Sequence, residues 1–165
     1  MGVRLGVLDV GSNTVHLVAV DAAMGGRPTP MSDWKIPLRL VEQLDKKGNI
    51  HEKGLKKLVS AVGEASELGE KLGCSEFIAF ATSAVRSAPN SEAVLDEVEK
   101  QTGVRLQILS GVEEAQLTFL AARRWYGWSA GRITNLDIGG GSLELSTGTD
   151  EHPDLAFSLD LGAGR

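Results

Sequence analysis

The chain has 165 residues, of which 42% are hydrophobic and 24% charged, and its formal net charge is −5. This composition is typical of a globular protein with one sizeable core and excludes a disordered chain. The acidic balance argues against nucleic-acid binding through the overall field, and no apolar run approaches the length of a membrane span. The single cysteine, Cys74, excludes an internal disulfide, and together with the lack of a secretory pattern it predicts a cytoplasmic protein.

The first part of the chain predicts three extended segments and then a helix. Residues 3–10 form an apolar run and residues 14–20 a returning strand. A third extended segment is expected over 35–44, where apolar residues keep even spacing, and Pro37 indicates either an edge strand or a strand that begins late. A stripe of apolar residues then predicts a helix over 52–72.

The second part alternates strands and helices. We expect a buried strand at 76–81, a polar loop at 82–90, a helix at 91–103 capped by its first serine, a strand at 104–109 and a helix at 110–125. The order is therefore strand, strand, strand, helix, strand, helix, strand, helix.

Residues 136–145 combine an apolar run, three consecutive glycines and a second alternating run. Consecutive glycines cost backbone entropy, so they are kept where φ must be positive or where a ligand approaches the main chain. The amides of such a turn form an anion-binding nest. Asp137 and Glu144 flank the nest, and two carboxylates beside a phosphate cradle imply a divalent cation between them. A plain hairpin with a loose turn is the alternative.

The same pattern occurs near the start of the chain. Residues 8–17 align without a gap on residues 136–145 at an offset of 128 residues, and Thr14 falls on Ser142. A repeat of this period has the size of a domain. We therefore predict a duplicated domain, with domain I over residues 1–127 and the incomplete start of domain II over residues 128–165.

The order of elements resembles the ribonuclease H-like domain. Its duplicated form is the architecture of the superfamily of acetate and sugar kinases, heat-shock chaperones and actin. The resemblance implies an α/β fold, a mixed five-stranded sheet flanked by helices, followed by the first strands of a second copy. A doubly wound nucleotide-binding domain would need G-x-G-x-x-G leading directly into a helix, and Gly11 is followed instead by an alternating strand.

Four segments together resemble the exopolyphosphatase / guanosine pentaphosphate phosphohydrolase family. They are residues 9–14, 81–90, 110–115 and 137–144. Singly the glycine turns are shared by the whole superfamily, whereas all four in this order are specific. The resemblance runs over essentially the full chain but covers only the N-terminal half of a typical member.

Two adjacent glutamates open the last predicted helix. Ser110-x-x-Glu113 is a capping box, which explains Glu113 but not Glu114, whose side chain points about 100° further round the helix. The resemblance implies that Glu114 is the catalytic glutamate, which holds and deprotonates the attacking water. A place at a helix N-terminus is expected to lower the pKa of Glu114.

The resemblance also implies the phosphate and metal ligands. Arg86 would bind phosphate, although an arginine in a loop is as often a solvated charge or part of an ion pair; Arg39 is a weaker candidate for the same role. The other implied phosphate-binding residues are Gly11, Ser12, Asn13, Thr14, Gly139, Gly140, Gly141 and Ser142. Asp137 and Glu144 would hold Mg²⁺ or Mn²⁺, with Asp9 as a further candidate, whereas His16 is expected to be a strand residue.

The expected reaction is Mg²⁺-dependent hydrolysis of the terminal phosphoanhydride of inorganic polyphosphate, with release of orthophosphate. The alternatives are 5′-dephosphorylation of guanosine pentaphosphate, a sugar- or acetate-type kinase, and a non-catalytic actin-like module. The expected partners are polyphosphate or guanosine pentaphosphate and a second copy in a homodimer, with no nucleic acid and no membrane. The strands of domain II would lack the rest of their sheet, and unpaired strand edges tend to pair with other chains. Because domain II would be incomplete, the chain alone is expected to be weakly active or inactive.

Overall fold

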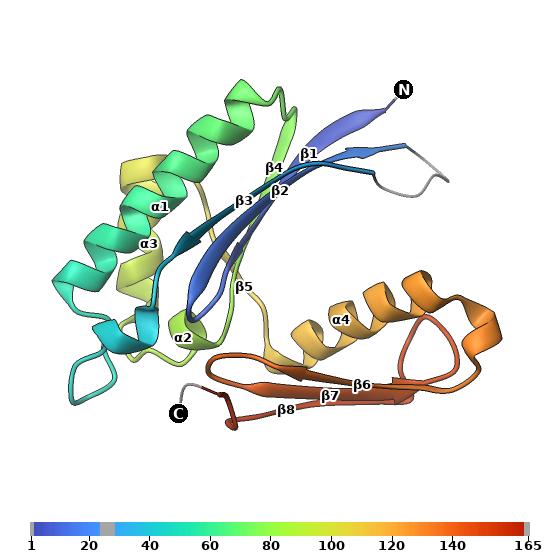
Figure 1. Ribbon diagram of the computed structural model, residues 1–165. Helices are drawn as coiled ribbons and strands as arrows, with labels where there is room; N and C mark the ends of the chain where they lie inside the picture. The colour runs from blue at the N-terminus through green and yellow to red at the C-terminus, as the bar shows by residue number, and fades with distance from the viewer. Residues whose placement is uncertain (1, 24–28, 164–165) are drawn as a thin grey trace. The chain divides into compact units, whose positions relative to one another are not determined.

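The computed structural model describes residues 2–23 and 29–163 and divides into two compact units, Met1–Ile108 and Leu109–Arg165. Figure 1 shows the elements of both. Among the described residues, no helix is both long and apolar enough to cross a membrane.

The first unit is built on a five-stranded sheet. Its strands lie in the order β3-β2-β1-β4-β5, in which β1 pairs antiparallel with β2 and parallel with β4. The strands are β1 Val3–Val10, β2 Thr14–Ala22, β3 Thr29–Pro37, β4 Glu76–Ala81 and β5 Gln107–Ile108. The expected mixed five-stranded sheet is confirmed, and β3, which contains Pro37, lies at its edge, one of the two alternatives that Pro37 indicated.

Two long helices, α1 Glu52–Lys71 and α3 Ser91–Thr102, pack against each other and lie side by side along the sheet (Figure 1). The apolar stripe of α1 and alternate residues of β1 and β2 form one core. Its fully buried members include Leu8, Leu17, Leu58, Val62 and Val98. Gly73 follows α1 with φ 75°, which ends the helix as expected.

The third extended segment differs from its prediction. β3 ends at Pro37, and a short 3-10 helix, η1 Leu40–Gln43, replaces the expected continuation. The even apolar spacing is still used, because Leu38 and Leu40 are both buried. Between them Arg39 turns left-handed, at φ 49° and ψ 52°, so Arg39 lies at the start of η1 and not on the strand.

Two smaller expectations are also corrected. Ser91 is the first residue of α3 and does not cap it; the N-cap is Asn90, whose side chain instead exchanges two 2.9 Å hydrogen bonds with the main chain of Ile50. The loop predicted at 82–90 contains a one-turn helix, α2 Ser83–Arg86, and the strand expected at 104–109 is reduced to the two residues of β5.

The second unit consists of one helix on a three-stranded antiparallel sheet. It contains α4 Gly111–Tyr126, the 3-10 turn η2 Trp128–Ala130, and strands β6 Ile133–Ile138, β7 Leu143–Gly148 and β8 Leu155–Leu159, in the order β6-β7-β8. α4 contacts all three strands, so the units divide before this helix, whereas the expected domain boundary lies after residue 127. The expected boundary differs because the order of elements along the chain does not determine whether α4 packs on the first sheet or on the second.

The two faces of this sheet have opposite character. The face toward α4 carries most of the polar side chains, together with Ile133 and Ala156, and the other face most of the apolar ones, together with Thr134 and Thr147, since residues paired across strands share a face. The polar set is Asn135, Asp137, Glu144, Ser146 and Ser158. The apolar set is Leu136, Ile138, Leu143, Leu145, Leu155, Phe157 and Leu159, of which Leu136 and Ile138 are 59% and 66% exposed.

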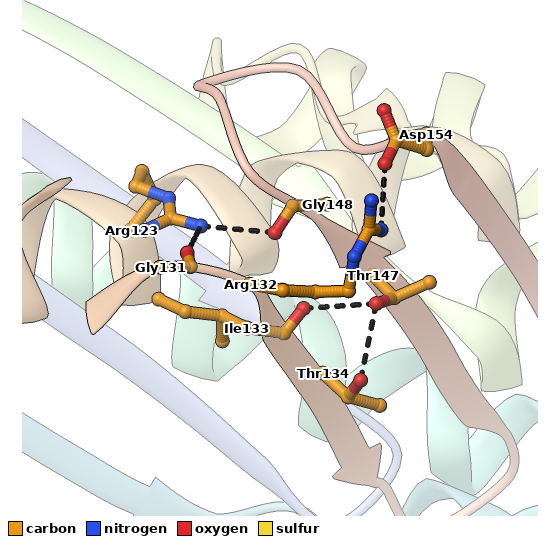
Figure 2. Close-up of polar contacts among 8 residues, drawn as sticks. All are labelled: Arg123, Gly131, Arg132, Ile133, Thr134, Thr147, Gly148 and Asp154. Carbon is orange, nitrogen blue, oxygen red and sulfur yellow. Dashed lines mark hydrogen bonds and ion pairs between the residues drawn. The ribbon is translucent and has the colours of Figure 1, made fainter. Parts of the chain in front are cut away.

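A buried arginine joins α4 to two of these strands. Arg123 is fully buried and donates to three main-chain carbonyls, at Gly127 (3.2 Å), Gly131 (2.7 Å) and Gly148 (2.9 Å). Figure 2 shows its bonds to Gly131, just before β6, and to Gly148, the last residue of β7. Its guanidinium carbon also lies 5.7 Å from the centre of the Trp128 ring. Arg123 therefore fixes the C-terminal end of α4 against the hairpin.

Candidate functional site

The two predicted phosphate turns have the same geometry. In each, the amide of a glycine donates a 2.9 Å hydrogen bond to the carbonyl three residues later: Gly11 to Thr14, and Gly139 to Ser142. A Cβ added to these two glycines would lie 3.2 and 3.3 Å from that carbonyl oxygen. Neither glycine has a positive φ. Glycine is therefore favoured here because a side chain would crowd the nearby carbonyl oxygen, and not because the backbone is left-handed. The repeat is thus the same hairpin folded twice.

The first turn is held by the chain that follows β3. The amides of Leu38 and Arg39 donate to the Asn13 carbonyl at 2.8 and 3.0 Å, and the amide of Leu40 donates to the Ser12 carbonyl at 2.7 Å. Asn13 itself is exposed. These bonds leave the main chain of the turn rigid, with an exposed amide side chain at its tip.

Within the same unit, α2 packs beside the first turn. Ser12 is 5% exposed, and its hydroxyl lies 2.8 Å from that of Ser83, the first residue of α2. The amide of Thr82 donates to the carbonyl of Val10 at 3.1 Å. Arg86, half-buried, is the last residue of α2. The structure therefore brings the helix that carries Arg86 to the turn that carries Ser12.

Asp9 and His16 face each other across the first hairpin. His16 is a strand residue, as predicted, and its Nε2 lies 2.9 Å from Asp33 Oδ2 on β3. This hydrogen bond lowers the pKa of Asp33 below its usual range. The His16 ring is therefore engaged by a carboxylate on its own sheet.

The second turn is flanked by two carboxylates. Asp137 and Glu144 are directly opposed on β6 and β7. Glu144 is 1% exposed, and Ser158 on β8 donates a 2.7 Å hydrogen bond to its Oε1. Residues 162 and 163 pack against this turn. The Ala163 amide donates to Gly139 O at 2.9 Å, and a Cβ on Gly162 would overlap the turn.

α4 begins with the predicted capping box. Ser110 N donates to Glu113 Oε2 at 2.8 Å, and Glu113 N donates to Ser110 Oγ at 3.2 Å. Hydrogen bonds from Ser110 lower the pKa of Glu113. Glu113 is exposed and Glu114 half-buried, so the two glutamates differ as predicted in which side of the helix they occupy.

One hydroxyl joins the helix that carries Glu114 to the carboxylate pair. Thr118 Oγ1 donates to the Glu114 carbonyl at 2.9 Å and lies 3.5 Å from Asp137 Oδ2. The part of α4 one helical turn after Glu114 therefore lies next to Asp137. The second unit thus contains the helix that carries Glu114, the carboxylate pair and the second glycine turn.

The profile of the Ppx/GppA phosphatase family matches residues 18–165. The chain belongs to the Ppx/GppA phosphatase family. Among curated relatives, it is 65% identical over 162 residues to Exopolyphosphatase 1 of Mycobacterium leprae and 64% identical to Exopolyphosphatase 1 of Mycobacterium tuberculosis H37Rv. These matches cover 98% of the chain but 48% and 47% of the relatives, so the chain spans about half their length.

Solved structures of the Ppx/GppA family have the same fold. An exopolyphosphatase from Cytophaga hutchinsonii superposes with a TM-score of 0.88 at 27% identity, over 96% of this chain and 51% of that one. The Aquifex aeolicus family member gives 0.84 at 23% identity, over 98% and 52%. The ethanolamine utilization protein EutJ from Carboxydothermus hydrogenoformans gives 0.57 at 17%, over 96% and 52%. The predicted superfamily fold is confirmed.

Asp137 and Glu144 fit a magnesium ion, which needs few protein ligands. The described residues contain no group of three or more His, Cys, Asp or Glu side chains that could hold a metal. Mg²⁺ typically takes one or two carboxylates and completes its shell with water and substrate phosphates. The buried Glu144 carboxylate also requires compensation beyond one hydroxyl, because burial of a carboxylate is costly unless it is paired. Asp137 and Glu144 supply the two carboxylates, and a bound cation would compensate the buried charge of Glu144.

Sequence reasoning missed three side chains around these turns, Ser83, Thr118 and Ser158. Ser83 lies three residues before Arg86, Thr118 lies four residues after Glu114, and Ser158 is the one polar residue of β8. Their partners Ser12, Asp137 and Glu144 are 71, 19 and 14 positions away. The register that brings them together is set by sheet pairing, so no local motif could have indicated them.

Proposed function

We propose that this chain acts in an exopolyphosphatase reaction, the Mg²⁺-dependent hydrolysis of the terminal phosphoanhydride of inorganic polyphosphate. The observation that carries the proposal is the contact of Thr118, one helical turn after Glu114 on α4, with Asp137, which pairs with Glu144 beside the second glycine turn. The name of the relatives at 64–65% identity supports polyphosphate as the substrate.

Glu114 would orient the attacking water and accept its proton as the water oxygen bonds to the terminal phosphorus and the bridging P–O bond breaks. The products are orthophosphate and a chain shorter by one phosphate. Asp137 and Glu144 would hold Mg²⁺ or Mn²⁺. The bound ion would supply neutralisation of the charge that develops on the phosphate oxygens.

The turns would fix the substrate. Amides and side chains of both turns would bind phosphate oxygens, and Arg86 would add a bidentate contact. In the first turn these groups are Gly11, Ser12, Asn13 and Thr14; in the second they are Gly139, Gly140, Gly141 and Ser142. Because the chain carries a net charge of −5, binding of a polyanion depends on such local donors and not on the overall field.

The proposal extends to the assembly and the compartment. A second copy of the chain would cover the apolar face of β6–β8, whose residues Leu136 and Ile138 are more than half exposed, to form a homodimer. The single cysteine, Cys74, suits a reducing cytoplasm. Burial raises the pKa of its thiol, which favours a packing role over a reactive one.

Orthophosphate release from polyphosphate with Mg²⁺, measured on the full-length protein with the wild-type sequence and with Glu114→Gln, tests the proposal. We expect the variant to lose about a hundredfold or more in turnover while still binding polyphosphate, because the group that accepts the proton is gone. Glu113→Gln is the matched control: it changes the neighbouring exposed glutamate, and because glutamine can still accept the hydrogen bond of the Ser110 amide and so keep the capping box, it should keep turnover. Full turnover in Glu114→Gln would overturn the role of Glu114.

The choice of substrate is tested in parallel. Guanosine pentaphosphate and ATP with a sugar or acetate acceptor are offered under the same conditions. Release of orthophosphate from guanosine pentaphosphate alone would move the assignment to the nucleotide phosphohydrolase. ATP consumption that requires an acceptor would indicate a kinase.

A further inference from the structure

Arg39 has an unusual backbone. Among the described residues it is the one residue other than glycine with a positive φ, at φ 49° and ψ 52°. Its neighbours Leu38 and Leu40 are 2% and 0% exposed, so both are anchored in the core. The main chain turns at Arg39 between these two buried residues, where the amides of residues 38–40 donate to the first turn.

The main chain around Arg39 stabilises the first phosphate turn. The amides of residues 38–40 donate to the carbonyls of Ser12 and Asn13 and so hold the first phosphate turn. Any residue with an N–H group can make these bonds, and glycine or asparagine adopts the left-handed conformation at lower cost. Strain of this kind is found where the side chain is needed for function.

Packing within the unit does not account for the arginine side chain. It is 68% exposed, and its Nη1 lies 3.7 Å from Glu42 Oε1, which is 62% exposed. An exposed pair at this distance contributes little to stability. The guanidinium therefore stays available at the end of a long side chain, and the Arg39 amide donates to the carbonyl of Asn13, whose side chain is exposed. Arginine is the side chain best suited to bind phosphate by two parallel hydrogen bonds.

We propose that Arg39 is a substrate-binding residue that contacts a phosphate of the polyanion held by the first turn, in addition to Arg86. This inference rests on the proposed function and adds one phosphate-binding side chain to its substrate site. Arg39 sets the affinity for the phosphate chain and takes no part in proton transfer.

A glycine substitution separates this role from a structural one. Arg39→Gly removes the side chain and relieves the left-handed strain, whereas Arg105→Gly removes an equal charge from an exposed position of the same unit that has no positive φ. Inorganic tripolyphosphate binding is measured by isothermal titration calorimetry on the whole chain, with the midpoint of thermal unfolding for each variant. We expect Arg39→Gly to bind about tenfold more weakly, with an unchanged or higher midpoint. Arg105→Gly should bind normally, with a lower midpoint.

Three outcomes would overturn the inference. Wild-type affinity in Arg39→Gly would show that Arg39 does not touch the ligand and would leave the proposed function intact. Equal weakening in Arg39→Gly and Arg105→Gly would assign the effect to net charge, and a large drop in the Arg39→Gly midpoint would make the arginine structural. Failure of the wild type to bind tripolyphosphate would overturn the proposed function together with the inference.

Discussion

Glu144 is a buried carboxylate whose orientation depends on a residue outside the recognised motifs. Ser158, from the next strand, donates to Oε1 and leaves the other lone pairs of the carboxylate open to a cation or to water. Partners of this kind hold a metal-binding carboxylate in its productive orientation. Ser158 is therefore a positioning residue in the proposed Mg²⁺ site.

Ser158→Ala should weaken Mn²⁺ binding about tenfold, because Glu144 loses the hydrogen bond that orients it. The measurement is a Mn²⁺ titration followed by electron paramagnetic resonance, which does not depend on turnover. Thr134→Val is the control, since it removes a hydroxyl from the opposite face of the same sheet. Equal Mn²⁺ affinity in Ser158→Ala and the wild type would contradict the assignment.

At the scale of elements, α4 is fixed at both ends. Its N-terminus is closed by the capping box of Ser110 and Glu113, and its C-terminus by Arg123. Between them Thr118, one helical turn after Glu114, lies 3.5 Å from Asp137 Oδ2. The precision of the proposed site therefore depends on contacts at the two ends of a 16-residue helix.

The capping box should make helix stability depend on pH. Hydrogen bonds from Ser110 lower the pKa of Glu113 in the folded state below its ordinary value of 4.5. The ionised form is therefore stabilising above 4.5, and this contribution is lost as the pH falls through the folded-state pKa. Glu113→Gln should have a slightly lower unfolding midpoint than the wild type at neutral pH. The difference should disappear in acid, and a constant difference would refute the explanation.

Arg123→Ala should reduce the free energy of unfolding by about 3 kcal/mol, because three main-chain carbonyls, of which that of Gly148 is buried, lose their donor and a cavity is left. Urea unfolding measures this value. The adjacent Arg124 forms an exposed ion pair with Glu151 at 3.0 Å, so Arg124→Ala should cost less than about 1 kcal/mol. Similar losses in both variants would show that burial of Arg123 contributes nothing specific.

At the scale of the whole molecule, the sheet of the second unit presents an uncovered apolar face. Exposed apolar patches of this kind mark surfaces that associate. Leu136 and Ile138 lie on the edge strand β6, which adds an unpaired row of main-chain groups.

Ile138→Lys should lower the tendency of the chain to self-associate, because burial of an ammonium group in an apolar interface is costly. Sedimentation equilibrium over a range of protein concentrations measures the change. Lys35→Gln, at an exposed position of the first unit, should leave association unchanged. A wild-type chain that stays monomeric at all concentrations would remove the homodimer from the proposal.

Much of this protein follows from its sequence alone. The two glycine turns, the capping box and the order of strands and helices depend on residues close together in the chain, so local spacing was sufficient to predict them. The expectation of a long third strand was wrong for a physical reason. Its alternating leucines are buried as the pattern requires, but hydrogen bonds to the distant Ser12 and Asn13 carbonyls turn the backbone at Arg39.

The tertiary structure alone decided which distant residues meet. The contacts of Ser12 with Ser83 and of Glu144 with Ser158 depend on the packing of α2 beside the first turn and on the pairing of β7 with β8. The packing of α4 on β6–β8 likewise depends on which apolar surfaces fit together. Such pairings are selected by the free energy of the whole sheet and core, which no short stretch of sequence contains.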